Sequence, residues 1–441
     1  MRFLFWCYRR AAGVRRRLLR RFTPAGRMVL GAWCLISMLA TNPGQTVAYQ
    51  AWVLLTVLLL AGLAFAPGFR LRVRASRALP RFGTAGEPLR YRVRLQSLGR
   101  QAQNHLEFGE VFHGAHLDFK AFADRLRPGR RNRSFQLSAP LPTPDLAKAG
   151  VMPVPPLSPG GTVDFAAEVL PLRRGPLRFV EVWVGRQDPL GLVRALRKTA
   201  VPADVLILPR RYPVAPGALP GATRYQHGGV TFASGIGESE EFVGVREYRR
   251  GDPLRRVHWR VSARLGRPVV REYQDEFFVR HALVLDTFCD ASLDGLFEDA
   301  VSVAASFACT VPDQDSLLDL LFVGPGTVCV TAGRGVGRTE QMLEVLACAQ
   351  PCRAPRFDDL ANLVLRHSGR LSGCLLVLLD WDAPRRALVA RLRALRIPVW
   401  ALVILPRGGK LDPASATAVE QPDRLVVLES GRLAEGLLAL R

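Results

Sequence analysis

The chain has 441 residues, enough for two or three domains, because one hydrophobic core seldom organises more than about 250 residues. Its formal net charge of +23 first suggests a nucleic-acid binder, but the placement of the arginines argues otherwise. Nine arginines fall in the first 27 residues and five more between Arg70 and Arg81, so two basic clusters flank one uncharged block. This arrangement is typical of membrane topology, and we expect no nucleic-acid partner.

Residues 28–69 carry no charged side chain and predict a two-helix transmembrane hairpin after a basic cytoplasmic N-terminus, residues 1–27. The run exceeds one span of ~20 residues, so we expect spans at Met28–Thr41 and Val47–Ala66, with a turn at Asn42-Pro43-Gly44. Basic flanks on both sides keep both termini in the cytoplasm. The chain is therefore predicted to be a multi-pass protein of the cell inner (plasma) membrane, contacting the lipid bilayer through residues 28–69. A soluble buried hairpin is the alternative.

Residues 70–215 predict a β-rich, sandwich-like domain. Arg90-Tyr91-Arg92-Val93-Arg94-Leu95 alternates apolar and basic side chains, as a half-buried strand requires. Pro/Gly turns such as Asp188-Pro189-Leu190-Gly191 separate short strands, which is typical of antiparallel sandwiches. We expect the proline-rich stretch from Pro140 to Gly161 to interrupt the sandwich as a mobile loop.

Residues 276–441 predict an α/β Rossmann-like domain, so the whole chain is expected to be an α+β multidomain protein. Strands are expected at His281–Asp286, Leu375–Asp380 and Val399–Leu405, with helices between them. Alternating strands and helices imply a mostly parallel sheet covered on both faces. Sites in such sheets form beyond the carboxyl ends of the strands, where Asp286 and Asp380 fall.

Residues 216–275 form a segment rich in motifs: Gly237-Glu-Ser-Glu-Glu-Phe242, Gly244-Val-Arg-Glu-Tyr248, Gly251-Asp252, Arg256-Val-His-Trp-Arg260 and Ser262-Ala-Arg264. This segment closely resembles the signature of the bacterial family catalogued as domain of unknown function 58. The resemblance implies a membrane hairpin, a β-rich domain and a von Willebrand factor A-like α/β domain. Members of the family are typically encoded beside MoxR-type AAA+ ATPases and transglutaminase-like proteins, and no biochemical activity is established for them.

We single out nine signature residues as partner-binding or structural: Glu241, Phe242, Arg246, Glu247, Tyr248, Gly251, Asp252, Trp259 and Arg264. Arginine forks pair with carboxylates, so the favoured interpretation is an ion-pair network that pins the segment to the α/β domain, with Trp259 as an apolar anchor. The alternative is a docking surface for an acidic partner or lipid headgroups. His258 and Ser262 would share a helix face but lack an orienting acid, so a structural histidine is expected.

A metal site is not expected in the α/β domain. Von Willebrand A domains that bind a divalent metal use Asp-x-Ser-x-Ser, whereas this chain has Asp286-Thr287-Phe288-Cys289-Asp290. Phenylalanine cannot ligate, and three carboxylates without hydroxyls (Asp286, Asp290 and Asp380) would make a different, more anionic site. The eight cysteines lack zinc-finger spacing, and Gly333-Arg-Gly335-Val-Gly337 lacks the ending of a phosphate-binding loop, so no cofactor is expected.

These observations favour a non-enzymatic, membrane-anchored adaptor or scaffold that presents its von Willebrand A-like domain to a cytosolic partner. The family resemblance implies a MoxR-type AAA+ ATPase as that partner. Two alternatives stay open. One is a metal-assisted hydrolase that uses Asp286, Asp290 and Asp380, and the other is a binder of anionic surfaces, either lipid or nucleic acid, which the net charge supports.

Overall fold

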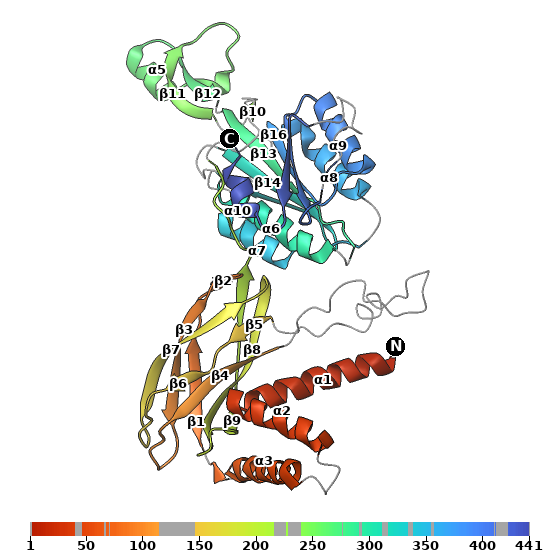
Figure 1. The fold of residues 1–441 in the computed structure, drawn as a ribbon. Coiled ribbons are helices and arrows are strands. Elements are labelled where there is room, and N and C mark those ends of the chain that lie inside the picture. The colour runs from red at the N-terminus through yellow and green to blue at the C-terminus, as the bar shows by residue number, and fades with distance from the viewer. Residues whose placement is uncertain are drawn as a thin grey trace. The chain divides into compact units, whose positions relative to one another are not determined.

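The computed structural model describes residues 2–39, 46–65, 68–69, 71–113, 146–215, 226–227, 240–275, 277–290, 293–310, 316–333, 338–353, 357–409, 411 and 422–440. These residues divide into two compact units, Met1–Pro209 and Arg210–Arg441 (Figure 1).

Three helices open the first unit: α1 (Arg2–Arg21), α2 (Pro24–Leu39) and α3 (Thr46–Phe65). Helices α2 and α3 contact each other through two side-chain hydrogen bonds. Trp33 Nε1 donates to Thr56 Oγ1 at 2.8 Å, and Trp52 Nε1 donates to Ser37 Oγ at 2.9 Å. Both indole N–H groups therefore have the partner that they require away from water.

Among the described residues, one helix is long and apolar enough to cross a membrane, the stretch Val47–Phe65 of α3, and 11% of that stretch is buried inside the structure. This stretch coincides with the second predicted span. Helix α2 has 16 residues, fewer than the ~20 of a full span, and Thr41 at the end of the first predicted span lies outside the described residues. The structure thus supports membrane association through one apolar helix.

Two sheets form the rest of the first unit, with strand orders β1-β3-β7-β5 and β2-β9-β8-β4-β6. The strands are β1 (Val73–Ala78), β2 (Phe82–Thr84), β3 (Leu89–Ser97), β4 (Leu106–Phe112), β5 (Ala147–Ala149), β6 (Met152–Val154), β7 (Thr162–Pro171), β8 (Gly175–Gln187) and β9 (Arg194–Leu208). Strand β3 alternates buried apolar and exposed arginine side chains, as predicted. Apolar side chains of both sheets, among them Leu95, Phe108 and Phe179, form one buried cluster, which is the hydrophobic core of this β-rich part of the unit.

Strands β5 and β6 correct one prediction. Both lie within the stretch from Pro140 to Gly161 that we expected to be a loop, yet β5 pairs with β7 and β6 pairs with β4. Pro153 fits β6 because that strand is at the edge of its sheet, where a missing N–H breaks no ladder. The loop prediction was therefore wrong for residues 147–154, while residues 140–145 lie outside the described part.

The sandwich buries one ionised cluster around Glu110. Arg77 Nη2 donates to Glu110 Oε2 at 2.9 Å, and the Tyr91 hydroxyl donates to Glu110 Oε1 at 2.8 Å. The Arg77 guanidinium also lies 4.8 Å from the ring centroid of Phe179. Burial outweighs the attraction of Arg77 and raises the pKa of Glu110 to about 6.

This shift predicts a pH dependence of stability. The pKa of Glu110 in the folded state lies above the ordinary 4.5, so the folded state holds its proton more tightly than the unfolded state. The stability that this protonation contributes is complete below pH 4.5 and is lost as the pH rises through about 6. We expect a loss of about 2 kcal/mol over that window relative to Glu110→Gln, which does not titrate. Urea unfolding of the detergent-solubilised protein at several pH values, read by hydrogen exchange in β8, measures the difference. Parallel pH profiles for the two proteins would contradict it.

The turn Asp188–Gly191 holds the helices against the sandwich within the first unit. Asp188 Oδ1 accepts hydrogen bonds from the backbone N–H groups of Leu192 and Val193, each at 2.7 Å. Thr23, between α1 and α2, donates its hydroxyl to Gly191 O at 2.5 Å and its N–H to Leu192 O at 3.0 Å. Phe22, Leu59, Leu192 and Val193 form a small buried cluster at the same place. The turn is therefore a docking element for the ends of the helices.

A seven-stranded sheet organises the second unit, with the main order β15-β14-β13-β16-β17-β18 and β10 paired to β13. Its strands are β10 (Gln226–His227), β13 (Phe277–Leu285), β14 (Ser316–Val323), β15 (Thr327–Ala332), β16 (Gly373–Leu378), β17 (Val399–Leu405) and β18 (Arg424–Glu429). Along the main order neighbours are parallel except β14 and β15. The strands predicted after His281 are thereby confirmed.

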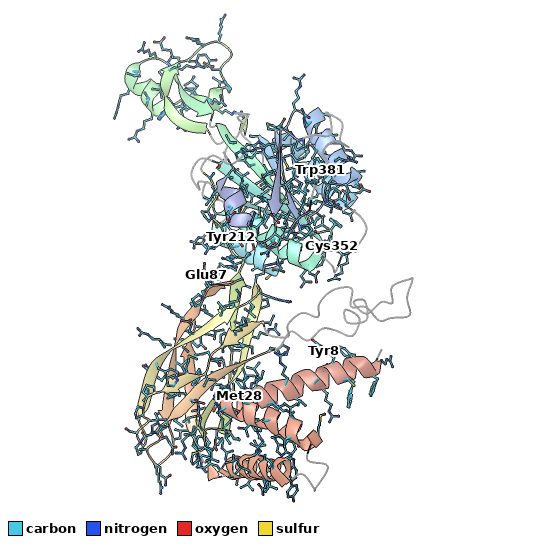
Figure 2. The ribbon with its side chains drawn as sticks, in the orientation of Figure 1. Tyr8, Met28, Glu87, Tyr212, Cys352 and Trp381 are labelled. Atoms are coloured by element: carbon cyan, nitrogen blue, oxygen red, sulfur yellow. The ribbon has the colours of Figure 1, made fainter. Side chains whose placement is uncertain are left out.

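Helices cover both faces of this sheet (Figure 1). They are α6 (Asp294–Ala308), α7 (Thr339–Cys348), α8 (Asp358–His367), α9 (Ala383–Ala394) and α10 (Leu433–Leu438). Ala282 and Val284 of β13 share a buried cluster with α8 and α9, whereas Leu283 and Leu285 alternate to the other face, which α6 contacts. Trp381, which follows β16 and precedes α9 in the sequence, has a buried side chain and is labelled in Figure 2. The mixed α/β organisation agrees with the prediction.

Candidate functional site

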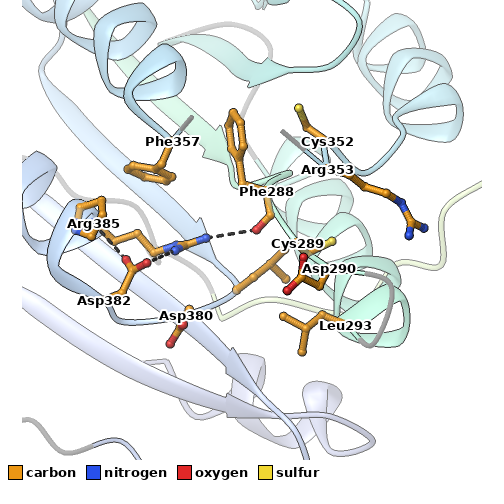
Figure 3. Close-up of a pocket in the computed structure, with 12 residues that line it drawn as sticks. Phe288, Cys289, Asp290, Leu293, Cys352, Arg353, Phe357, Asp380, Asp382 and Arg385 are labelled. Carbon is orange, nitrogen blue, oxygen red and sulfur yellow. Dashed lines mark hydrogen bonds and ion pairs between the residues drawn. The ribbon is translucent and has the colours of Figure 1, made fainter. Parts of the chain in front are cut away.

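A cavity of about 310 Å³ lies beyond the carboxyl ends of β13 and β16 (Figure 3). The chain leaves β13 toward β14 and leaves β16 toward β17, so the two connections run in opposite directions from the neighbouring strands β13 and β16. Open parallel sheets bind ligands at such switch points. The side chains that matter for its chemistry are Phe288, Cys289, Asp290, Arg353, Asp380, Asp382 and Arg385.

Arg385 is the central cation of this site. Its Nε donates to Asp286 Oδ2 at 2.7 Å, its Nη1 to Asp382 Oδ2 at 2.6 Å, and its Nη2 to Phe288 O at 3.2 Å. Asp286 is fully buried and also accepts hydrogen bonds from the backbone N–H groups of Phe288 and Leu379. The guanidinium therefore neutralises a carboxylate that would otherwise be an isolated charge in the interior.

The electrostatics of the pair follow from its burial. Burial raises the pKa of Asp286, and the Arg385 guanidinium together with two backbone N–H groups opposes that rise. Burial lowers the pKa of Arg385, but Asp286 and Asp382 outweigh it, so the pKa of the guanidinium lies above its ordinary value. Arg385 is thus a permanent charge, and it offsets part of the cost of burying the Asp286 carboxylate.

Asp290 and Asp380 behave differently from Asp286. Both side chains line the cavity and are exposed, and Asp380 Oδ1 accepts a hydrogen bond from the Trp381 N–H at 2.7 Å. Both oxygens of Asp286 already accept hydrogen bonds from protein groups. Across the described residues, no three His, Cys, Asp or Glu side chains are grouped as a metal would need.

Cys289 is a buried thiol at the cavity. Burial raises its pKa to about 12, so the sulfur is protonated at neutral pH. A thiol that is not ionised is a poor nucleophile and a poor metal ligand. Cys289 therefore acts as a small apolar side chain in this site.

Arg385 was missing from the candidate residues that the sequence suggested. The buried side chains of α9 are Arg385, Leu388, Val389 and Leu392, which share one helix face at spacings of three and four residues. The sequence did contain a signal for Arg385, because this arginine continues the apolar stripe of α9. It indicates a charge that turns inward to meet a buried carboxylate.

The signature segment forms a second candidate site. Strands β11 (Glu240–Glu247) and β12 (Val269–Asp275) pair antiparallel, and the short helix α5 (Trp259–Leu265) follows the 3₁₀ turn η2 (Leu254–Arg256) between them. In this register Glu241 lies opposite Gln274, and Phe242 lies opposite Tyr273.

Ion pairs join charged side chains within the described part of this segment. Arg246 donates through Nη1 and Nη2 to the two oxygens of Asp252, each at 2.7 Å, and lowers the pKa of Asp252 to about 2. Glu247 pairs with Arg267 across the base of the hairpin. These charges organise the segment internally, and the pinning of the segment to the α/β domain stays a prediction.

Backbone contacts complete the same hairpin. The Tyr248 N–H donates to Pro268 O at 3.0 Å. Gly251 has a φ of 111°, which favours glycine and lets the chain turn toward Asp252. The Ser262 hydroxyl accepts from the Val269 N–H at 2.9 Å, so it is used structurally and is not presented to His258 as a nucleophile.

The segment buries Val257, Val269 and Val270 but leaves three larger apolar side chains exposed. Trp259 is 67% exposed, Leu254 66% and Leu265 51%, and Arg264 is exposed beside them. Trp259 was predicted to be an apolar anchor of the segment, but its side chain is mostly exposed in the described part of the chain. The cause is the shortness of α5, whose one buried side chain is Ser262. The segment therefore presents a mixed apolar and basic surface.

The second unit is thus a mixed α/β domain with a cavity at the carboxyl edge of its sheet and a β-hairpin segment that carries the signature motifs. Residues 244–411 match the family model described as "Protein of unknown function DUF58". The match begins inside the signature segment and extends through β17, in agreement with the resemblance seen in the motifs. It covers neither the helices nor the sandwich of the first unit.

Two curated relatives are the Uncharacterized protein Rv1480 of Mycobacterium tuberculosis (strain ATCC 25618 / H37Rv) and the Uncharacterized protein Mb1516 of Mycobacterium bovis (strain ATCC BAA-935 / AF2122/97). Each is 30% identical over 201 residues, which is 42% of this chain and 61% of the relative. The chain therefore spans less than two thirds of these relatives.

Similarity to solved structures is low. The sporulation control protein Spo0M from Bacillus subtilis is 12% identical over 32% of this chain and 50% of its own, with a TM-score of 0.17. A beta-glucosidase from Listeria innocua is 13% identical over 31% of this chain and 16% of its own, also with a TM-score of 0.17. Neither likeness carries an argument about fold or function.

Proposed function

We propose that this chain is a membrane-anchored, non-enzymatic adaptor that presents the signature segment of its α/β domain to a cytosolic partner. One observation carries the proposal: Leu254, Trp259 and Leu265 are more than half exposed on one small segment, beside exposed arginines. Exposed apolar side chains with a polar rim mark protein interaction sites, and tryptophan and arginine are the residues most enriched in their hot spots.

The charge of this surface defines the chemistry of the partner. Arg250, Arg260 and Arg264 are exposed on the segment, so an acidic face on the partner would be complementary to it. The family resemblance points to a MoxR-type AAA+ ATPase, and we propose such an ATPase as the partner on that basis.

The same proposal includes a von Willebrand A-like assignment for the α/β domain. Its support is the strand order, with a parallel sheet, the antiparallel edge strand β15 and helices on both faces. The Arg385–Asp286 pair supports a version of that domain that works without a metal, because the guanidinium already balances the buried carboxylate. Magnesium titration of the full-length protein by calorimetry tests this, and saturable binding lost in Asp286→Ala would contradict it.

The membrane topology is part of the proposal as well. We propose α2 as a second span beside α3, with both termini in the cytoplasm. The support is the pair of indole hydrogen bonds between the helices and the arginines on both flanks of residues 28–69.

Replacing Trp259 with alanine tests the docking surface. We expect the full-length protein in detergent to retain a purified MoxR-type ATPase, locked with a non-hydrolysable ATP analogue, and the Trp259→Ala variant to bind it at least tenfold more weakly, because truncation of a hot-spot residue costs about 2 kcal/mol or more. Leu395→Ala is the matched control, since Leu395 is 48% exposed outside the segment. Equal retention of the ATPase by all three proteins, or by none, would count against the adaptor.

A further inference from the structure

We propose that helix α1 lies in the plane of the membrane and binds anionic lipid headgroups, an inference that rests on the membrane attachment proposed above. Residues 1–27 were predicted to be a basic cytoplasmic N-terminus, and the structure forms a helix of 20 residues, α1, within them. An amphipathic helix needs an apolar environment for one face and a polar environment for the other, and the membrane–water interface supplies both environments.

The apolar face of α1 is exposed. Phe3, Cys7, Val14 and Leu18 are separated by four, seven and four residues, so they form one line along the helix. Phe3 is 73% exposed, Val14 50% and Leu18 36%, and Trp6 beside them is 52% exposed. Figure 2 shows the side chains of α1 standing away from the helix, with Tyr8 labelled. Such a face is costly in water and fits the boundary between headgroups and acyl chains.

The charge of α1 selects the lipid. The helix contains eight arginines and no acidic residue, and Arg2 and Arg9 lie opposite the line of apolar side chains. Arginines on an interfacial helix extend toward the headgroups and are attracted by anionic lipids, each adding to the binding. The occupant is therefore an anionic membrane surface rather than an apolar groove of a protein.

The junction after α1 places the helix at the right depth. Phe22 and Thr23 follow α1 directly and contact the turn Asp188–Gly191 together with Leu192 and Val193. The same turn contacts the last turns of α3, because Leu59 is in that cluster and a Cβ on Gly62 would lie 3.1 Å from Val193 Cγ2. The end of α1 and the end of α3 are thus held at one level, which for a spanning α3 is the membrane surface.

Trypsin cleavage after the arginines of α1 tests the inference. Full-length protein is reconstituted into vesicles of phosphatidylcholine alone or mixed with phosphatidylglycerol, and cleavage in α1 is measured relative to cleavage at Arg260 in the same molecules. We expect cleavage in α1 to be about tenfold slower or more in the anionic vesicles, and to recover in Val14→Ser/Leu18→Ser. Gly13→Ser is the matched control, because Gly13 lies off the apolar line and has no neighbour within 4 Å.

The outcomes separate the two proposals. Protein that inserts into both kinds of vesicle but is cleaved in α1 at one rate overturns the lipid assignment and leaves the anchor by α3 intact. Protein that inserts into neither overturns the anchor and this inference together. Equal protection of α1 by duplex DNA in detergent would assign the surface to nucleic acid and also overturn the proposal.

Discussion

Replacing Arg385 with alanine is expected to lower the free energy of unfolding of the α/β domain by about 3–5 kcal/mol, because it strands a buried carboxylate without its partner. Asp286 would keep the hydrogen bonds from two backbone N–H groups but would lose the ion pair with the Arg385 guanidinium. A domain of ordinary stability has only about 5–15 kcal/mol, so this variant should approach unfolding. Hydrogen exchange in the core strands β13 and β16 of the detergent-solubilised protein reports the loss.

The controls for Arg385→Ala isolate the buried pair. Arg391→Ala removes an exposed arginine from the same helix and should change the free energy of unfolding by less than about 0.5 kcal/mol. Asp286→Asn combined with Arg385→Ala should recover part of the loss, because the amide carries no charge.

The pH dependence gives a further check. In Arg385→Ala the pKa of Asp286 should rise further, so the deficit should shrink as the pH falls and grow as the pH rises through that pKa. A deficit that is the same at every pH, or is matched by Arg391→Ala, would contradict the proposed role of the pair.

Introducing one methyl group at Gly26 is expected to detach the start of α2 from the sandwich. A Cβ at Gly26 would lie 2.0 Å from the carbonyl oxygen of Leu192, which is backbone and cannot rotate away. We expect Gly26→Ala to cost about 2–3 kcal/mol, the upper range for overpacking. Faster hydrogen exchange at the amides of Thr23, Leu192 and Val193 should report the loss of the docked turn.

Gly31→Ala is the matched control for this change. Gly31 lies on the same helix with nothing within 4 Å of an added Cβ, so alanine should be neutral or stabilise α2 by up to about 1 kcal/mol. Equal exchange at Thr23 in the two variants would mean that the turn does not hold the helix.

Periodicity predicted the elements of the two β-containing domains well. Alternation in β3 reflects a strand with one solvated face, and the apolar runs of β13 and β16 reflect strands buried on both faces. Asp286 and Asp380 were predicted to follow these strands, and both do. The strand order could not be read from the chain, because pairing depends on contacts between segments that are far apart in sequence.

The predictions that failed concern side chains whose environment depends on tertiary contacts. Trp259 was expected in a core, but α5 is too short to bury it. Arg385 was overlooked because a charge within an apolar stripe is normally solvated, and its partner Asp286 lies 99 residues earlier. The short edge strands β5 and β6 escaped because three residues give no measurable period. Of the glycine-rich motif Gly333–Gly337, which was predicted not to be a phosphate-binding loop, Gly333 is described and residues 334–337 lie outside the described residues.

The proposed anchor and adaptor both require α3 to lie in a bilayer, and alkaline extraction of cell membranes tests this most directly. Full-length protein is followed by antibody after washing the membrane fraction with sodium carbonate. We predict that it stays in the sedimented membranes and is released only by detergent, because only 11% of the apolar stretch Val47–Phe65 of α3 is buried inside the described structure. Release of the intact chain into the carbonate supernatant would contradict the anchor and, with it, the adaptor.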